Sequence, residues 1–169
     1  MPPDSTSPDL TIHAVIDGMC IATWRNVFID LLSKPATVNS LRAIPPVVEK
    51  FFTRHGNQCI SISVLESTSL GPPPPEAKTI MDKLAKDYPN LASATVIEGT
   101  GFRLATARML LAGIFLMRKT PIPHKVFDNL QDGARFLGSH NPHFKRPDKD
   151  VTDLLAAVEE CRKKIPRGR

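Results

Sequence analysis

Residues 93–117 read SATVIEGTGFRLATARMLLAGIFLM. The first five residues are small or β-branched, which favours a buried strand over Ser93–Ile97. The tetrapeptide Glu98–Gly101 then turns the chain, and Phe102–Met117 carries apolar residues on nearly every side, which predicts a deeply buried helix. A strand that leads into a helix through Gly-Thr-Gly is the core unit of an open α/β sheet, so this stretch decides the predicted fold.

Composition indicates one compact domain followed by a tail. The chain has 169 residues and 41% hydrophobic residues, enough for a core that a disordered chain lacks. No apolar run reaches the ~20 residues of a membrane span, and the first residues lack the basic start and apolar stretch of a signal peptide. We expect a flexible arm over 1–9, an α/β domain over 10–137, a linker over 138–150, and a C-terminal helix with a basic tail over 151–169.

Cysteine content and charge argue against several classes of protein. Cys20, Cys59 and Cys161 are odd in number and widely spaced, so neither a disulfide framework nor a zinc site is predicted, and a reducing cytoplasm is the expected location. The net charge is +5, but much of the excess lies in the C-terminal tail, and one Trp and one Tyr are too few to stack bases. Nucleic acid is therefore not an expected partner.

Periodicity and turn residues predict strands that alternate with helices. The predicted elements are a strand Leu10–Ile16, a hairpin of Met19–Thr23 and Val27–Ser33, a helix towards Arg54, a strand Cys59–Leu65, a helix from Glu76 to near Asp87, the strand and helix described above, a strand Lys125–Phe127, a helix Leu130–Leu137 and a helix Val151–Ile165. Pro45 and Pro46 leave two alternatives for the first helix, which either begins at the prolines or is kinked there.

The end of the predicted domain adds a local motif. Residues Ile122–Asp128 read IPHKVFD, and Asp132–Leu137 read DGARFL. In SpoIIAA-like proteins a short strand ending in Val-Phe commonly leads to a helix with an acidic residue, Ala and a Trp-Leu pair; here Phe136 replaces the Trp. Together with the order of elements, this motif resembles the STAS/SpoIIAA-like superfamily, whose prototype is the bacterial anti-anti-sigma factor, over roughly Met19–Leu137.

The resemblance implies a fold and a class of function. The fold is α/β, a mixed open sheet of about five strands with helices packed on it, plus a C-terminal helix. The implied function is non-catalytic: a regulatory or scaffolding module that binds protein, without a cofactor. Anti-sigma antagonists of this superfamily carry a phosphorylated serine in an Asp-Ser-(Ser/Ala)-Gly motif at a helix start. Thr100, in the comparable turn of this chain, is therefore a candidate phosphorylation site.

The same turn is a candidate anion site. Backbone N–H groups at a helix start bind anions, glycines let a ligand approach the backbone closely, and an arginine in the first helical turn can complete a phosphate clamp. The candidate residues are Glu98, Gly99, Thr100, Gly101 and Arg103. The alternative is a plain capping turn, in which Thr100 bonds the helix backbone.

Arg108 lies among apolar residues, and a buried arginine needs a partner. Glu66 or Glu98, each at the end of a predicted strand, can supply the carboxylate, and we expect an ion pair of Arg108 with Glu66 in particular. His140 and His143 have HxxH spacing, but they lie in the expected linker, so no metal site is predicted. No motif of nucleophilic catalysis is present, and we do not expect an enzyme.

Other surfaces suit partners. Leu70–Pro75 is a proline-rich loop, which either serves as a stiff connector or is recognised by a groove of another protein. The hairpin Met19–Ser33 is expected to present a strand edge through which a homodimer can form. The C-terminal helix has three alternatives: its own domain, a second copy, or another protein. We therefore predict a protein partner. The alternative function is a sensor or enzyme that holds a phosphate-bearing or lipid molecule at Glu98–Arg103.

Overall fold

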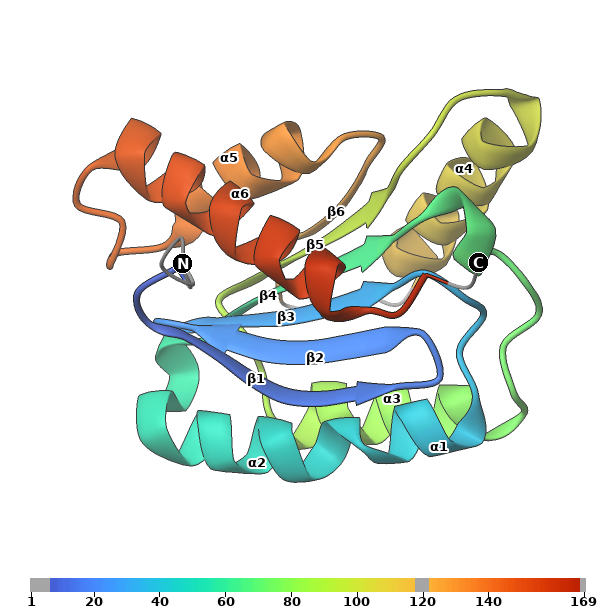
Figure 1. The fold of residues 1–169 in the computed structure, drawn as a ribbon, viewed down its shortest axis with the longest axis horizontal. Helices are drawn as coiled ribbons and strands as arrows, with labels where there is room; N and C mark the ends of the chain where they lie inside the picture. The colour runs from blue at the N-terminus through green and yellow to red at the C-terminus, as the bar shows by residue number, and fades with distance from the viewer. Residues whose placement is uncertain (1–6, 118–121, 168–169) are drawn as a thin grey trace.

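The structure, a computed structural model, describes residues 7–117 and 122–167 and places a single six-stranded sheet between two layers of helices (Figure 1). The strands are β1 (Leu10–Ile16), β2 (Met19–Trp24), β3 (Val27–Leu32), β4 (Ile60–Leu65), β5 (Ala92–Ile97) and β6 (His124–Phe127), and they lie side by side in chain order. The first three strands are antiparallel neighbours, whereas β3 to β6 are parallel. The predicted mixed α/β sheet is confirmed, with six strands where about five were expected.

The predicted hairpin lies inside the sheet. Strand β1 pairs along β2, and β4 pairs along β3, so neither strand of the hairpin Met19–Ser33 forms an edge. The expectation of an exposed hairpin edge is therefore wrong. It failed because the first strand, Leu10–Ile16, adds to the outer side of the hairpin and itself becomes an edge.

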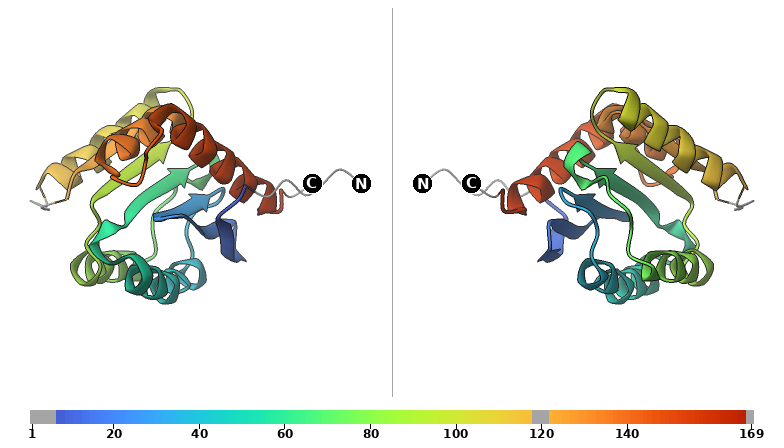
Figure 2. Two further views of the ribbon diagram at one scale, coloured as in Figure 1. Left: turned by 90° about the vertical axis from the view of Figure 1, so that its left-hand side faces the viewer. Right: turned by 90° about the vertical axis from the view of Figure 1, so that its right-hand side faces the viewer.

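Helices cover both faces of the sheet, as the views along its edge show (Figure 2). The helices are α1 (Val38–Arg42), α2 (Ile44–His55), α3 (Glu76–Asp87), α4 (Phe102–Met117), α5 (Leu130–His140) and α6 (Pro147–Lys164). The first three cover one face, and α5 and α6 cover the other (Figures 1 and 2). Thr37 caps α1 through a reciprocal bond with Ser40, and α2 begins anew at Ile44 with prolines in its first turn.

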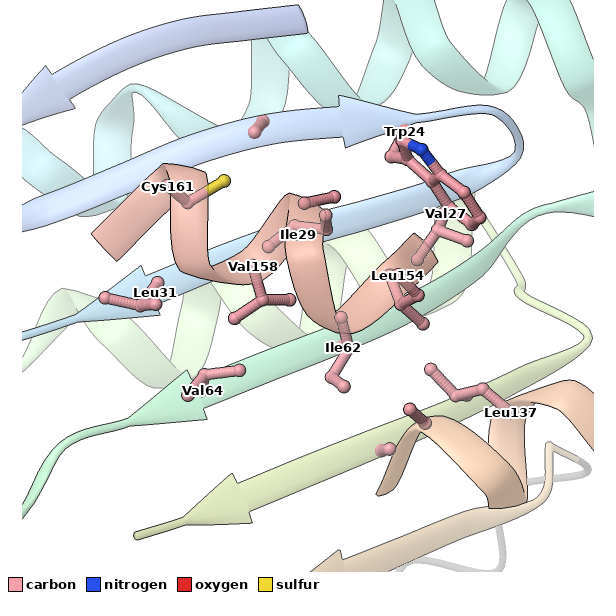
Figure 3. Packing of buried hydrophobic residues seen from close by; sticks show 14 of the residues in the cluster. Trp24, Val27, Ile29, Leu31, Ile62, Val64, Leu137, Leu154, Val158 and Cys161 are labelled. Atoms are coloured by element: carbon pink, nitrogen blue, oxygen red, sulfur yellow. The ribbon is translucent and has the colours of Figure 1, made fainter. Parts of the chain in front are cut away.

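The face under α5 and α6 forms the main core of the protein (Figure 3). Alternate residues of β3, including Val27, Ile29 and Leu31, are fully buried against Leu154 and Val158 of α6. The C-terminal helix thus packs on its own sheet, which was one of its three alternatives. Removing a buried leucine side chain from such a core costs about 2–5 kcal/mol.

Much of the segment expected to be a linker is ordered helix or cap. Helix α5 continues to His140 and α6 already begins at Pro147, so the connection is much shorter than 138–150. Within it Asn141 is buried, and its side-chain amide exchanges two hydrogen bonds of 3.0 Å with that of Asn26. This pair ties the connection to the β2–β3 turn.

Helix α4 departs from the sequence prediction in its environment. Leu104 is buried, but Phe102 is 90% exposed, Met109 76% and Leu110 64%. The expectation of a deeply buried helix is therefore wrong, although the strand and helix themselves are confirmed. The cause is the strand order: α4 crosses to the edge strand β6, where no neighbouring element lies over its outer side in the described chain. Within that part of the chain, no helix is both long enough and apolar enough to cross a membrane.

Candidate functional site

The sheet face towards α1–α3 carries a patch of polar side chains in the middle of the parallel strands. Because successive side chains of a strand point to opposite faces, the sequence Ile60–Leu65 sends Ser61 and Ser63 to this face and its isoleucines and valine to the core. Neighbouring strands contribute at the same level, since Asp30 pairs in register with Ser63, and Ser63 pairs with Thr95. We call Asp30, Ser61, Ser63, Ser93, Thr95 and His124 the polar floor.

Hydrogen bonds across the strands hold the polar floor together. The Ser63 hydroxyl donates to the Asp30 carboxylate at 2.7 Å, and the hydroxyls of Ser61 and Ser93 are 2.9 Å apart. The Thr95 hydroxyl lies 3.2 Å from Nε2 of His124. In the described chain no buried side-chain nitrogen or oxygen lacks a hydrogen-bond partner, so the floor is compatible with burial.

A cavity of about 330 Å³ lies above the polar floor. Its walls are mainly apolar side chains of strands β2 to β4, of helices α1 to α4 and of the segment before β6: Met19, Phe28, Leu32, Leu41, Ile44, Val48, Leu65, Met81, Leu84, Ala85, Leu111 and Ile122. Leu111 comes from α4, so the inner side of that helix helps to close the cavity. Apolar walls with a few convergent polar groups are the usual construction of a small-molecule site.

Burial shifts the pKa values of the two titratable groups of the floor, Asp30 and His124, in opposite directions. Burial raises the pKa of Asp30 to about 6, although the hydrogen bond from Ser63 acts against this rise. Burial lowers the pKa of His124 to about 4. At neutral pH the floor therefore presents one carboxylate and one neutral imidazole to the cavity.

The predicted anion site lies elsewhere, at the surface. Gly99 and Gly101 have φ angles of 113° and 110°, which explains the two glycines of the turn, because other residues rarely adopt them. Thr100 and Arg103 are exposed, and none of the residues from Glu98 to Arg103 lines the cavity. The roles of the turn in anion binding and of Thr100 in phosphorylation stay predictions.

Arg108 has other partners than the predicted glutamate. Its Nη1 donates to the carbonyl oxygens of Ile97 at 2.9 Å and Gly99 at 3.2 Å, so it fixes the turn before α4. Glu66 instead pairs with Arg162 of α6, and the predicted Arg108–Glu66 pair is wrong. The prediction failed because the arginine that meets the strand ends comes from a helix whose position the sequence left open.

Arg162 forms a bridge between the carboxyl ends of β4 and β5. Its guanidinium contacts Glu66, donates to Glu98 at 2.9 Å and reaches Glu159 at 3.2 Å. Burial alone lowers the pKa of Arg162, but its bonds to Glu98 and the other carboxylates outweigh this and raise it above its usual value. The two glutamates that follow the strands thus hold the C-terminal helix.

The polar floor was not predicted from the sequence, although the sequence carries a signal for it. The alternation in Cys59–Leu65 identified a strand. Its serines can be recognised as part of a polar patch only when the polar residues of the neighbouring strands are known to lie beside them. Asp30 interrupts the otherwise apolar strand Val27–Leu32, and Ser93 and Thr95 alternate with apolar residues in the strand Ala92–Ile97. In the described part of the chain, no group of three or more His, Cys, Asp or Glu residues is arranged to hold a metal ion.

Comparisons with known proteins give one likeness of fold. No protein-family model matches the chain, and no curated protein sequence matches it. Among solved structures, it is similar to an uncharacterized protein of the DUF3478 family from Shewanella loihica PV-4, described as having a SpoIIAA-like fold. The two are 18% identical, the match covers 75% of this chain and 99% of that one, and the TM-score is 0.47. The printed description of that protein's fold names the same superfamily that the sequence of this chain resembles.

Proposed function

We propose that this protein is a non-catalytic binding module that holds a small amphipathic molecule in the cavity above the polar floor. The observation that carries the proposal is the contrast between the two faces of one sheet. The face under α6 is filled by apolar side chains, whereas the opposite face places polar groups beneath a cavity of about 330 Å³. Burying polar groups is costly, so their position at a cavity is better explained by a ligand than by stability.

The floor also indicates the chemistry of the ligand. Above its pKa of about 6, Asp30 is a carboxylate, which favours an ammonium or hydroxyl head group over an anionic one. Neutral His124 can accept or donate a hydrogen bond. The surrounding walls, formed by residues such as Phe28, Leu84 and Leu111, suit an apolar body.

A head-group series tests this function. Decylamine, decanol and decanoate share one apolar chain and differ in charge, so we expect the amine and the alcohol to raise the melting temperature at pH 7.5 more than the carboxylate does. Asp30→Asn should remove the preference for the amine, while Asp128→Asn, at an exposed position outside the cavity, should keep it. Equal shifts from all three compounds, or the same loss in both variants, would contradict the proposal.

A second candidate function is a regulatory or scaffolding role through a protein partner. It is favoured by the outer side of α4, where Phe102, Met109 and Leu110 expose large apolar side chains. Co-purification of the protein with Phe102→Ser and Met109→Gln substitutions, against a Lys86→Gln control on α3, tests this role. A partner retained equally by all variants would exclude α4 as the docking surface, and self-association lost in the α4 variants would identify a homodimer.

A further inference from the structure

A second cavity, of about 770 Å³, lies on the other half of the molecule, between the outer strands β1 and β2 and helix α2. Figure 1 shows α2 running beneath β1 along this side of the sheet. We call this cavity the basic groove. Its lining includes His13 of β1, Arg25 after β2, and Lys50, Arg54 and His55 of α2, together with the hydroxyls of Thr11 and Thr23.

The groove carries an excess of positive charge that the protein does not neutralise. Its one lining carboxylate, Asp9, lies 3.6 Å from Arg25, which also binds Asp150 at 2.8 Å. In contrast, neither Lys50 nor Arg54 takes part in an ion pair among the described residues. The two are four residues apart on α2, so they stand on one side of the helix, one turn apart.

The positive groups are close enough to repel one another. The pKa of His13 is lowered by burial and by the charge of Lys50, and that of His55 by burial, by Arg54 and by His143. Like charges held together cost free energy, which an anion between them would recover. The groove is thus arranged for a negatively charged ligand, and its threonine hydroxyls can donate hydrogen bonds to the same group.

The positive surface continues beyond the groove. A neighbouring cavity of about 410 Å³ shares Arg25 and His55 with it and adds His143, Lys145 and Arg146 from the α5–α6 connection. Its one lining carboxylate, Asp150, is paired with Arg25 at 2.8 Å, so Lys145 and Arg146 leave an excess of positive charge. Two linked basic cavities suit a ligand with more than one anionic group. Because the net charge of the whole chain is +5, the long-range field also attracts such a ligand.

We propose that the basic groove binds a small phosphorylated molecule with at least two phosphate groups, through Lys50 and Arg54. This site is separate from the cavity above the polar floor, since no residue lines both cavities. It is also separate from the turn at Glu98–Arg103, which lines neither of the basic cavities.

Calorimetric titration of the full chain with inorganic tripolyphosphate tests the proposal. The expected result is binding of one molecule per chain, weakened about tenfold or more by Lys50→Gln or Arg54→Gln, because each loses a charge-assisted hydrogen bond. Lys86→Gln removes the same charge on exposed α3 and should change the affinity less than about twofold. All three side chains are exposed, so the variants are expected to fold, which melting curves check.

Several outcomes would overturn the proposal. The first is no binding of tripolyphosphate, and the second is an equal loss in all three variants, which indicates attraction by net charge alone. Titrations with ATP and with oligothymidylates of increasing length form the remaining arms. Comparable affinity for ATP supports a small phosphorylated ligand, whereas tighter binding that grows with oligonucleotide length would replace it with a nucleic acid.

Discussion

An Asp30→Asn variant is expected to be more stable than the wild type at neutral pH. Burial raises the pKa of Asp30 from 3.8 to about 6, so the folded state holds its proton more tightly than the unfolded state does. Between these two pH values the folded state binds more protons, and the free energy of unfolding falls as pH rises. The difference between the two pKa values corresponds to a loss of about 3 kcal/mol in the free energy of unfolding, at about 1.36 kcal/mol for each pKa unit. Asparagine can still accept the hydrogen bond of Ser63 and avoids this cost.

His124 has the opposite effect in the same pH range. Its pKa is lowered from 6.5 to about 4 by burial, so the unfolded state binds the extra proton, and stability rises as pH increases through that interval. In the wild type the two contributions largely cancel. Removing Asp30 leaves the contribution of His124, and a steep rise in stability between about pH 4 and 6.5 should appear.

Urea unfolding followed by circular dichroism between pH 4 and pH 8 measures this difference. Asp30→Asn and the wild type should be about equal at pH 4, and the variant should be more stable by about 2–3 kcal/mol at pH 7.5. Asp128→Asn, at an exposed position, should follow the wild type throughout. A difference that does not depend on pH, or a variant less stable at pH 7.5, would refute the reasoning.

Three further predictions concern the packing of the helices. Arg162→Met should lower the free energy of unfolding by about 2–3 kcal/mol in urea titrations, because it leaves two half-buried glutamates without their cation; a loss below 0.5 kcal/mol would contradict this bridge. Arg25→Ala should cost about 3 kcal/mol, because Asp150 is almost fully buried, and a second change, Asp150→Asn, should recover part of the loss. Gly133→Ala should lower the melting temperature, since the new Cβ would meet Val96 at 2.7 Å, whereas Gly113→Ala on α4 meets nothing within 4 Å and should raise it slightly.

Sequence patterns predicted the elements well because most of them depend on local signals. The alternation of Cys59–Leu65 and the proline before Glu76 placed a strand and a helix start close to where they occur. The order of the strands in the sheet was harder to predict from the sequence, since strand pairing depends on contacts between residues that are distant in the chain. The outer strand, Leu10–Ile16, shows this: its own pattern predicted a strand, but its partner decided that the hairpin would be internal.

The candidate site was the harder part to predict. The apolar run of Phe102–Met117 indicated burial on all sides. Hydropathy shows that a helix tends to be buried, but it does not show whether neighbouring elements are present to cover that helix at the edge of a sheet. Arg108 was expected to need a partner, and Glu66 was expected to supply it. Arg108 instead donates to a backbone carbonyl oxygen, and Glu66 pairs with Arg162, because the pairing depends on where α6 lies. The polar floor joins side chains from four strands, so no single stretch of the sequence displays it.

The docking of α6 on the first strands has a consequence for synthesis of the chain on the ribosome. The strands are added in chain order, but the apolar face of β2 and β3 is covered by Leu154, Val158 and Cys161, near the end of the chain. When all six strands have been synthesised but α6 has not, the apolar face of the sheet is therefore still exposed, and chaperones or neighbouring nascent chains can bind it. Completion of the fold is delayed until α6 leaves the exit tunnel, so chains truncated before residue 154 should aggregate.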